Sequence, residues 1–439
     1  MKKSFVILMM VSSTLLFASN YEQTAVAFIQ YLSTGEFDKA QQMVSQVMLD
    51  ALKQSKLTLE SFWKTLNSQV GNFKQILRVK STTEQGYNVV FVGCDFEKMK
   101  LDAKIVFDQQ EKIAGLQFLP YIEERTYTIP NYVKAEKFKE IDCVIKNKQW
   151  ELPAVLTLPE GNGPFAAVIL VHGSGPNDKD ETIGPNKPFK DIAWGLASNG
   201  IAVLRYDKRT KVYPEECVKM IDTFTVNDET VDDALAAIDL LKNFEKIDKD
   251  KIFILGHSLG ATMAPRIAAR SEKLAGIILL APTARGLYIL NALDQLEYIF
   301  SLDGKIDESE SKQLLDMREQ LERIQKRQLK DNEVVLGSSK AYWYDLLDYN
   351  PVELAKSLTV PILIMQGARD YQVTMKDFGI WHEVLKGKRN VAFKVYEDLN
   401  HLFIPGKGPS TPAEYQQPGN VDSKIIEDIV QWIKSLLSN

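Results

Sequence analysis

Cysteine and histidine are scarce in this chain of 439 residues, and their scarcity narrows the chemistry that it can perform. The three cysteines, Cys94, Cys143 and Cys217, allow at most one disulfide, so a scaffold held together by several disulfides is excluded. Their scattered positions match no metal-ligand spacing, which favours buried free thiols and no metal site. Only four histidines are available to act as a general base.

Massed positive charge and long apolar runs are also missing. The net charge is −5 and the lysines and arginines are scattered, so neither nucleic acid nor an anionic membrane surface is an expected partner. Beyond the amino terminus, no stretch is apolar enough to span a membrane. With 45% hydrophobic and 25% charged residues, the composition is that of a soluble globular protein, long enough for more than one domain.

The amino terminus has the three parts of a secretory signal peptide, which we predict over residues 1–19. Two lysines precede an apolar run at 5–17, and Ala18 and Ser19 follow that run. The run is too short to cross a bilayer comfortably. A buried amino-terminal helix is the alternative. The signal peptide predicts a secreted or periplasmic protein with no membrane span once the signal is removed.

Residues 20–119 are predicted to form a small α+β domain, which a linker at 120–133 joins to the rest. Apolar residues at helical spacing are followed by strand-like stretches, and helices followed by an antiparallel meander make such a module. It has no histidine and no cluster of catalytic type, so we expect a packing domain, with binding or assembly as the alternative. The predicted helices are 21–32, 37–47 and 57–70, and the predicted strands are 73–80, 87–94, 99–107 and 112–118.

Over residues 134–439 the pattern becomes an alternation of strands and helices. An antiparallel pair opens it, and short apolar runs then alternate with helical patterns. This predicts an α/β fold in which a doubly wound, mostly parallel sheet carries helices on both faces. The predicted strands are 138–145, 151–158, 166–171, 201–205, 251–255, 276–280, 360–365 and 392–396.

The turn Gly256-His257-Ser258-Leu259-Gly260 joins a predicted buried strand to a predicted helix. In so tight a turn, a side chain at position 256 or 260 would collide with the neighbouring strand or helix. Ser258 then stands clear of the backbone, above the positive end of the helix dipole. A G-x-S-x-G motif in this context is typical of a nucleophile elbow, and an ordinary glycine-rich turn is the alternative. The motif therefore predicts Ser258 as a nucleophile.

A serine nucleophile needs a general base, and His401 is the histidine best placed to supply it. His257 lies too close to Ser258 in sequence to turn onto it. His172, in a glycine-rich loop, and His382, on a predicted helix, have structural settings. His401 follows the last predicted strand, where the chain order Ser, Asp, His puts the base.

The acid that orients His401 is predicted to be Asp370, and Asp398 is its competitor. Asp370 ends the turn at 366–370, which follows a predicted strand and delivers the carboxylate to the carboxyl edge of the sheet. Asp398 lies three residues before His401, so its backbone would have to curl back to reach the far side of the ring.

Two backbone N–H groups are needed to stabilise the oxyanion of a tetrahedral intermediate. The N–H of Leu259, next to the nucleophile, is one of them. The glycine-rich loop at 172–175 supplies the other, from Ser174 or, as the alternative, from Gly173. An acidic run at 177–181 follows, and we expect its carboxylates to be solvated rather than to bind a cation.

Residues 285–357 interrupt the alternation where a short connection would suffice. They contain a helical pattern and several aromatic residues, among them Trp343 and Tyr344. An insertion at the carboxyl edge of such a sheet overhangs the place where ligands bind. We therefore predict a helical cap in which Trp343 and Tyr344 bind substrate, with a solvated hairpin remote from the site as the alternative.

The motifs at 172–176, 256–260, 366–370 and 400–401 together resemble the secreted two-domain α/β-hydrolase esterases close to the dienelactone-hydrolase group. The loop at 173–182 is similar to that of a thermophile carboxylesterase in which a small α+β domain precedes the hydrolase. The resemblance implies a serine carboxylesterase without a metal or an organic cofactor. A dienelactone hydrolase proper would have a cysteine nucleophile, so Ser258 favours ordinary esters.

The predicted function is therefore that of an exported carboxylesterase that hydrolyses short-chain or aromatic acyl esters through an acyl-enzyme intermediate. The expected partner is a small-molecule ester. The sequence is also compatible with a homo-oligomer formed through the amino-terminal domain or the cap. A thioesterase uses the same machinery. A peptidase of the prolyl-oligopeptidase kind would carry propeller-like repeats, and a non-catalytic binding protein would lack a triad residue.

Overall fold

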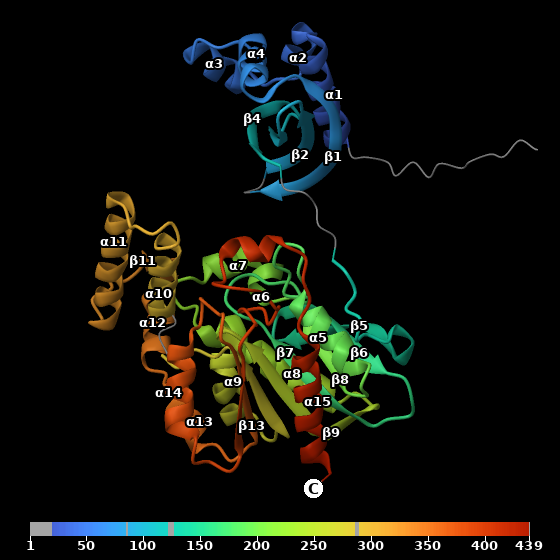
Figure 1. Cartoon of the computed structure of the whole chain (residues 1–439), viewed down its shortest axis with the longest axis vertical. Coiled ribbons are helices and arrows are strands. Elements are labelled where there is room, and N and C mark those ends of the chain that lie inside the picture. Colours follow the sequence, from blue (N-terminus) through green and yellow to red (C-terminus); the bar gives the residue numbers. More distant parts are fainter. Residues whose placement is uncertain (1–19, 85–86, 122–126, 286–288, 439) are drawn as a thin grey trace, which may run out of the picture. The chain divides into compact units, whose positions relative to one another are not determined.

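The structure, a computed structural model, describes residues 20–84, 87–121, 127–285 and 289–438 (Figure 1). The predicted signal peptide at 1–19 lies outside the described residues, as does part of the predicted linker. The chain divides into two compact units, Met1–Glu124 and Arg125–Asn439. Each unit has its own hydrophobic core, and each is described by itself below.

The amino-terminal unit is an α+β domain, as predicted, in which four helices precede a four-stranded antiparallel meander. Its core gathers helix residues such as Phe28 and Trp63 against strand residues such as Phe96. The helices are α1 (Asn20–Thr34), α2 (Phe37–Gln42), α3 (Gln46–Gln54) and α4 (Leu59–Val70). The strands are β1 (Phe73–Glu84), β2 (Tyr87–Phe96), β3 (Lys100–Phe107) and β4 (Ile113–Pro120).

The single helix predicted at 37–47 is wrong, because the chain breaks it after α2. Val44 forms an isolated β-bridge with Ile113, which pulls the backbone out of the helix. Ser45 then starts α3, since its side chain accepts a hydrogen bond from the N–H of Met48 at 3.3 Å. A contact distant in sequence therefore overrides the local helical spacing.

The second unit is built on an eight-stranded sheet with the strand order β14-β13-β10-β9-β7-β8-β6-β5. β6 runs opposite to the other seven strands, so the carboxyl ends of those seven strands lie at one edge of the sheet. The strands are β5 (Phe138–Asn147), β6 (Trp150–Pro159), β7 (Phe165–Val171), β8 (Ala202–Tyr206), β9 (Ile247–His257), β10 (Gly276–Leu280), β13 (Ile362–Gly367) and β14 (Val391–Tyr396).

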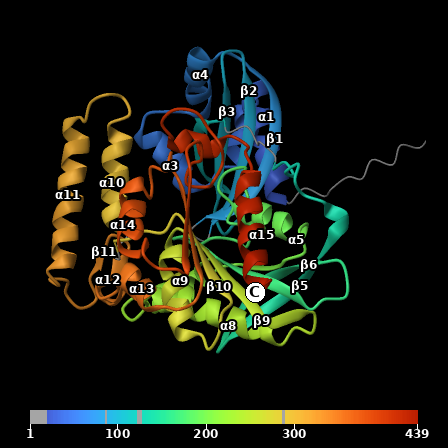
Figure 2. The same ribbon diagram turned by 60° about the horizontal axis from the view of Figure 1, so that its bottom comes forward.

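Helices cover both faces of this sheet, which confirms the doubly wound α/β fold (Figures 1 and 2). Along β9, Ile252 and Ile254 belong to one core while Phe253 and Leu255 belong to the other, as alternation along a strand requires. One face carries α5 (Pro188–Ala197) and α15 (Ser423–Leu437). The other carries α8 (Asp232–Lys242), α9 (Leu259–Arg270), α13 (Pro351–Ser357) and α14 (Met375–Leu385).

The insertion between β10 and β13 is mostly helical. Figure 2 shows α10 and α11 side by side as a hairpin next to α14. The elements of the insertion are α10 (Ile289–Phe300), α11 (Glu308–Gln325), β11 (Val334–Val335), β12 (Ser338–Ser339) and α12 (Lys340–Leu347), followed by α13, which packs on the sheet.

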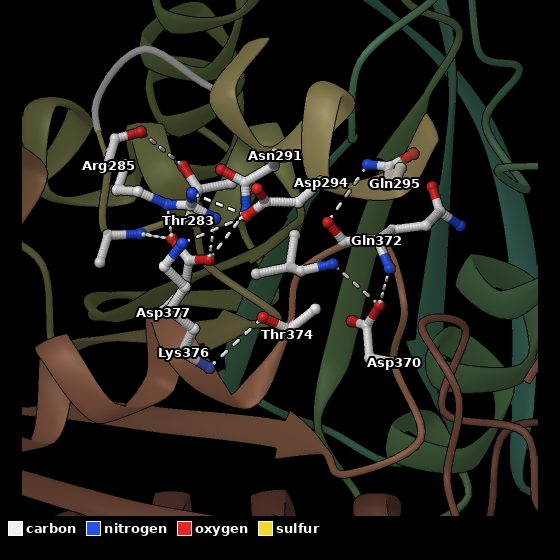
Figure 3. Close-up of polar contacts among 12 residues, drawn as sticks. Thr283, Arg285, Asn291, Asp294, Gln295, Asp370, Gln372, Thr374, Lys376 and Asp377 are labelled. Atoms are coloured by element: carbon white, nitrogen blue, oxygen red, sulfur yellow. Dashed lines mark hydrogen bonds and ion pairs between the residues drawn. The ribbon is translucent and has the colours of Figure 1, made fainter. Parts of the chain in front are cut away.

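A buried carboxylate anchors the root of the insertion (Figure 3). Asp377, at the start of α14, has a fully buried side chain and accepts hydrogen bonds from the N–H of Ala284 at 3.0 Å and from Asn291 Nδ2 at 2.8 Å. Arg285 Nη2 lies 2.8 Å from the same carboxylate, and Arg285 Nη1 lies 2.8 Å from Asp294. The chain that leaves β10 and the first turns of α10 are therefore tied to α14.

None of the helices in the described ranges is both long and apolar enough to cross a membrane. The three cysteines carry free thiols, of which Cys94 and Cys217 are buried. Burial raises the pKa of the Cys94 thiol to about 12, so this side chain stays a neutral apolar group.

Removing the Asp377 carboxylate should destabilise the second unit strongly, because Arg285 would lose its buried partner. We expect Asp377→Ala to lower the free energy of unfolding by about 3 kcal/mol in urea denaturation. Asp294→Ala is the matched control, since Asp294 contacts the same guanidinium with a side chain that is 32% exposed. It should cost less than about 1 kcal/mol. Equal losses in the two variants would contradict the anchoring role.

Candidate active site

The turn after β9 has the strained geometry of a nucleophile elbow. Ser258 has φ 53° and ψ −115°, a conformation that non-glycine residues rarely adopt. A Cβ on Gly256 would lie 2.3 Å from the carbonyl carbon of Gly260, and a Cβ on Gly260 would lie 2.1 Å from the carbonyl oxygen of Val171. Both glycines are therefore required where β9 turns sharply into α9. The N–H of Ser258 donates to the carbonyl of Leu280 at 2.9 Å, which fixes the turn against β10.

The structure pairs His401 with Asp370, the predicted acid. His401 Nδ1 lies 2.6 Å from Asp370 Oδ2, and both side chains are buried. The other oxygen, Oδ1, accepts the N–H groups of Gln372 at 2.7 Å and Val373 at 2.9 Å (Figure 3). Gln366 Nε2 also donates to Oδ2 at 3.2 Å, so four donors hold the carboxylate in one orientation. The competing Asp398 is exposed.

The loop after β7 lies against Ser258. A Cβ on Gly173 would come within 3.2 Å of Ser258 Cβ. The N–H of Gly173 donates to Glu181 Oε1 at 2.7 Å, so the alternative oxyanion donor Gly173 is already engaged. Ser174, which is exposed, stays the candidate from this loop, together with the N–H of Leu259 at the start of α9.

The expectation that the acidic run at 177–181 is solvated is wrong, because the side chain of Glu181 is only 2% exposed. Glu181 Oε2 lies 2.9 Å from His257 Nδ1, and His257 Nε2 donates to the carbonyl of His401 at 3.0 Å. Burial by itself raises the pKa of the Glu181 carboxyl, but His257 lowers it below its ordinary value. Burial lowers the pKa of the His257 imidazole, and Glu181 raises it above its ordinary value. The two groups thus stabilise each other as a buried ion pair.

The remaining histidines take structural positions. His172 is buried, its Nε2 donates to the carbonyl of Asp178 at 3.0 Å, and burial lowers its pKa to about 4. It is therefore neutral near pH 7 and secures the loop. The ring of His382, on α14, contacts the rings of Phe378 and Phe393.

A cavity of about 370 Å³ opens beside Ser174. Most of its lining comes from the segment between β8 and α8, which holds α6 (Arg209–Val212), α7 (Pro214–Lys219) and η2 (Asn227–Val231), and from the insertion. Its lining residues include Thr210, Cys217, Ile221, Phe224, Leu336 and Tyr342. Among the described residues, no group of three or more potential metal ligands is clustered.

Trp343 and Tyr344, which are predicted to bind substrate, do not line this cavity. Trp343 is fully buried and its indole N–H donates to the carbonyl of Val335 at 2.8 Å. The Tyr344 hydroxyl accepts the N–H of Leu329 at 3.0 Å. Neither residue lines the cavity beside Ser174, whereas Tyr342 does. Successive residues of a helix point about 100° apart, and only the face of α12 with Tyr342 meets the cavity.

The family described as serine aminopeptidase, S33, a hydrolase family, matches residues 162–405, and a domain of unknown function, DUF3887, matches residues 25–116. Esterase EstD of Thermotoga maritima is 41% identical over 94% of this chain and 95% of its own length.

Solved structures that are similar to this one include the following two. Est1E from Butyrivibrio proteoclasticus is 16% identical, with 68% of this chain and 99% of that chain covered and a TM-score of 0.44. The acylaminoacyl peptidase of Pyrococcus horikoshii is 15% identical, with 82% and 56% covered and a TM-score of 0.47. From the family match and the identity to EstD, the chain belongs to the α/β-hydrolases of the serine aminopeptidase S33 family.

Proposed function

We propose that the chain is an exported serine carboxylesterase that works through an acyl-enzyme intermediate. The observation that carries the proposal is the buried pair of His401 and Asp370 at 2.6 Å, together with Ser258 in a strained elbow. The ring of His257, the residue before Ser258, lies 4.6 Å from the ring of His401. The 41% identity to a protein named as an esterase supports the substrate class.

In this mechanism, Ser258 Oγ attacks the ester carbonyl while His401 Nε2 takes its proton. Asp370 holds the Nδ1–H of His401, which keeps the base in the correct tautomer and stabilises the imidazolium that forms. The N–H groups of Leu259 and Ser174 stabilise the oxyanion. His401 then gives its proton to the leaving alcohol, and a water molecule, activated by the same base, hydrolyses the acyl-enzyme.

The name of the family raises an aminopeptidase as the second candidate. Such an enzyme needs an uncompensated carboxylate near the site to bind the free ammonium group of its substrate. The carboxylate that lines the cavity beside Ser174 is Glu229, and it is already compensated. Lys208 Nζ lies 2.5 Å from Glu229 Oε1, and the Tyr342 hydroxyl donates to Oε2 at 2.5 Å. The charge balance favours a neutral substrate group.

The same cavity supports a short-chain or aromatic acyl group as the ligand. Its wall carries the apolar side chains of Ile221, Phe224 and Leu336. A volume of about 370 Å³ has room for a phenyl ring and a short linker. The ester is proposed as the one small-molecule partner, and the predicted signal peptide supports secretion or a periplasmic location. Amino-terminal sequencing of the exported protein tests that location.

Ser258→Ala removes the nucleophile and should reduce kcat for p-nitrophenyl esters by about 10³-fold or more. The residual rate would come from substrate binding and the oxyanion hole alone. Thr262→Val is a control, because Thr262 lies one turn further along α9 and its hydroxyl contacts only the elbow carbonyl and Thr283. Undiminished turnover in Ser258→Ala would overturn the mechanism.

Asp370→Asn should reduce kcat by about 10³–10⁴-fold, because an amide cannot hold His401 in the required tautomer. Asp398→Asn is the matched control and should stay close to the unaltered enzyme, since that side chain is exposed. Steady-state kinetics of both variants, with thermal melts to show that they fold, make the comparison. The opposite ranking would move the acid to Asp398.

Changes to the cavity wall should alter acyl preference. Ile221→Trp fills the cavity, so kcat/KM should fall about 10–200-fold for benzoyl and hexanoyl esters while the acetyl ester is little affected. Phe224→Ala should shift the preference toward longer chains. Ile380→Trp on the exposed side of α14 serves as the control. If all three variants keep the same chain-length profile, the acyl group binds elsewhere.

A further inference from the structure

One buried carboxylate connects three parts of the site that are far apart in sequence. Glu181 Oε1 accepts the N–H of Gly173 at 2.7 Å, in the loop after β7. Glu181 Oε2 lies 2.9 Å from Nδ1 of His257, the residue before the nucleophile. His257 Nε2 in turn reaches the backbone carbonyl of His401 at 3.0 Å. The chain of contacts therefore runs from the loop after β7, past the elbow, to His401. Because that loop carries the candidate oxyanion donor Ser174, it is called the oxyanion loop below.

The positions of the hydrogens follow from the partners. A backbone carbonyl only accepts, so His257 Nε2 must carry a hydrogen. A ring nitrogen and a carboxylate oxygen 2.9 Å apart need one proton between them, since two lone pairs would repel each other. Glu181 is thus held by the hydrogen bond from Gly173 and by the ion pair with His257, and His257 is held by that ion pair and by its hydrogen bond to the carbonyl of His401.

The other side of Gly173 is held by a second buried charge. Lys208, which is 2% exposed, places Nζ 2.7 Å from the carbonyl oxygen of Gly173. That carbonyl and the N–H of Ser174 belong to the same peptide group, and in a trans peptide they point in opposite directions. By holding the oxygen, Lys208 also sets the direction of the Ser174 N–H, the candidate oxyanion donor.

We propose that Glu181 is a positioning residue, which acts through His257 and together with Lys208. It holds the oxyanion loop and the catalytic base at the positions relative to Ser258 that the reaction requires. The inference rests on the proposed function, because it assigns roles to Ser174 and His401. Glu181 touches no reacting atom. Its effect comes from geometry, and a displacement of about 1 Å in a reacting group can cost about 10²-fold in rate.

Two substitutions at Glu181 separate geometry from charge. In Glu181→Gln, the amide oxygen can accept the Gly173 N–H, and the amide nitrogen can donate to a neutral His257, so every contact has a counterpart. We expect kcat within about threefold of the unaltered enzyme, since the groups stay in place. Glu181→Ala removes the contacts, and we expect kcat to fall about 10²-fold with KM little changed.

The measurement is kcat per active site, with the sites titrated by an organophosphonate so that inactive protein does not count. A trifluoromethyl ketone, which forms a tetrahedral adduct with an oxyanion, should bind Glu181→Ala more weakly by a factor similar to the loss in kcat/KM.

The matched control is Asp191→Ala. Asp191 is an equally buried carboxylate that accepts hydrogen bonds from Tyr127 and from the N–H of Val421, neither of which belongs to the site. It should lower the melting temperature and leave kcat per site unchanged.

Ser258→Ala, assayed per mole of folded protein because it has no serine to titrate, separates a failure of the proposed function from a failure of the positioning role. Full activity in Ser258→Ala would overturn the proposed function itself. If Ser258→Ala is inactive but Glu181→Ala keeps full kcat per site, the positioning role is wrong and the function stands. A loss in Glu181→Gln as large as that in Glu181→Ala would also overturn it, since charge rather than geometry would then matter. If Glu181→Ala does not fold, His257→Ala replaces it, with the same expected direction and an unchanged kcat as the contradicting result.

Discussion

The close approach of two glycines to their neighbours is the constraint on which the site depends. Gly256 and Gly260 bring β9 and α9 so near to each other and to β7 that a Cβ would fall 2.1–2.3 Å from backbone atoms. This approach forces Ser258 into a positive φ and lifts it out of the sheet. The strain is supported by the packed strands on both sides, which is how strained backbone persists at functional sites. Everything else in the site is arranged around that fixed serine.

The parallel sheet explains why the other parts of the site arrive at the same place. β7, β9, β13 and β14 are neighbours or near neighbours that run in one direction, so the segments that follow them emerge at one edge. The loop after β7 carries Ser174, the turn after β13 carries Asp370, and the loop after β14 carries His401. Buried charges then fix these segments. Asp370 accepts from its own turn, and Glu181 and Lys208 hold Gly173 from two sides.

The sequence predicts the parts of the site that depend on local pattern and chain order. The elbow can be predicted because only glycine fits the two ends of its motif. Asp370 and His401 are predicted from their positions directly after successive strands. Other features depend on contacts that no local pattern reveals. In the sequence, Glu181 is indistinguishable from the other charged residues of a polar loop. Its burial depends on His257, which lies 76 residues further along the chain (257 − 181). Which face of α12 meets the cavity is likewise decided by tertiary packing, so no local pattern distinguishes Tyr342, which lines the cavity, from its neighbours Trp343 and Tyr344.

The most direct test of the account is a crystal structure of the protein after reaction with an ester-like phosphonate. The account predicts one phosphorus bonded to Ser258 Oγ, with the phosphoryl oxygen about 3 Å from the N–H groups of both Leu259 and Ser174. His401 should still contact Asp370 in that adduct. A phosphonate bonded to any other residue, or an oxygen that faces away from the loop after β7, would contradict the account.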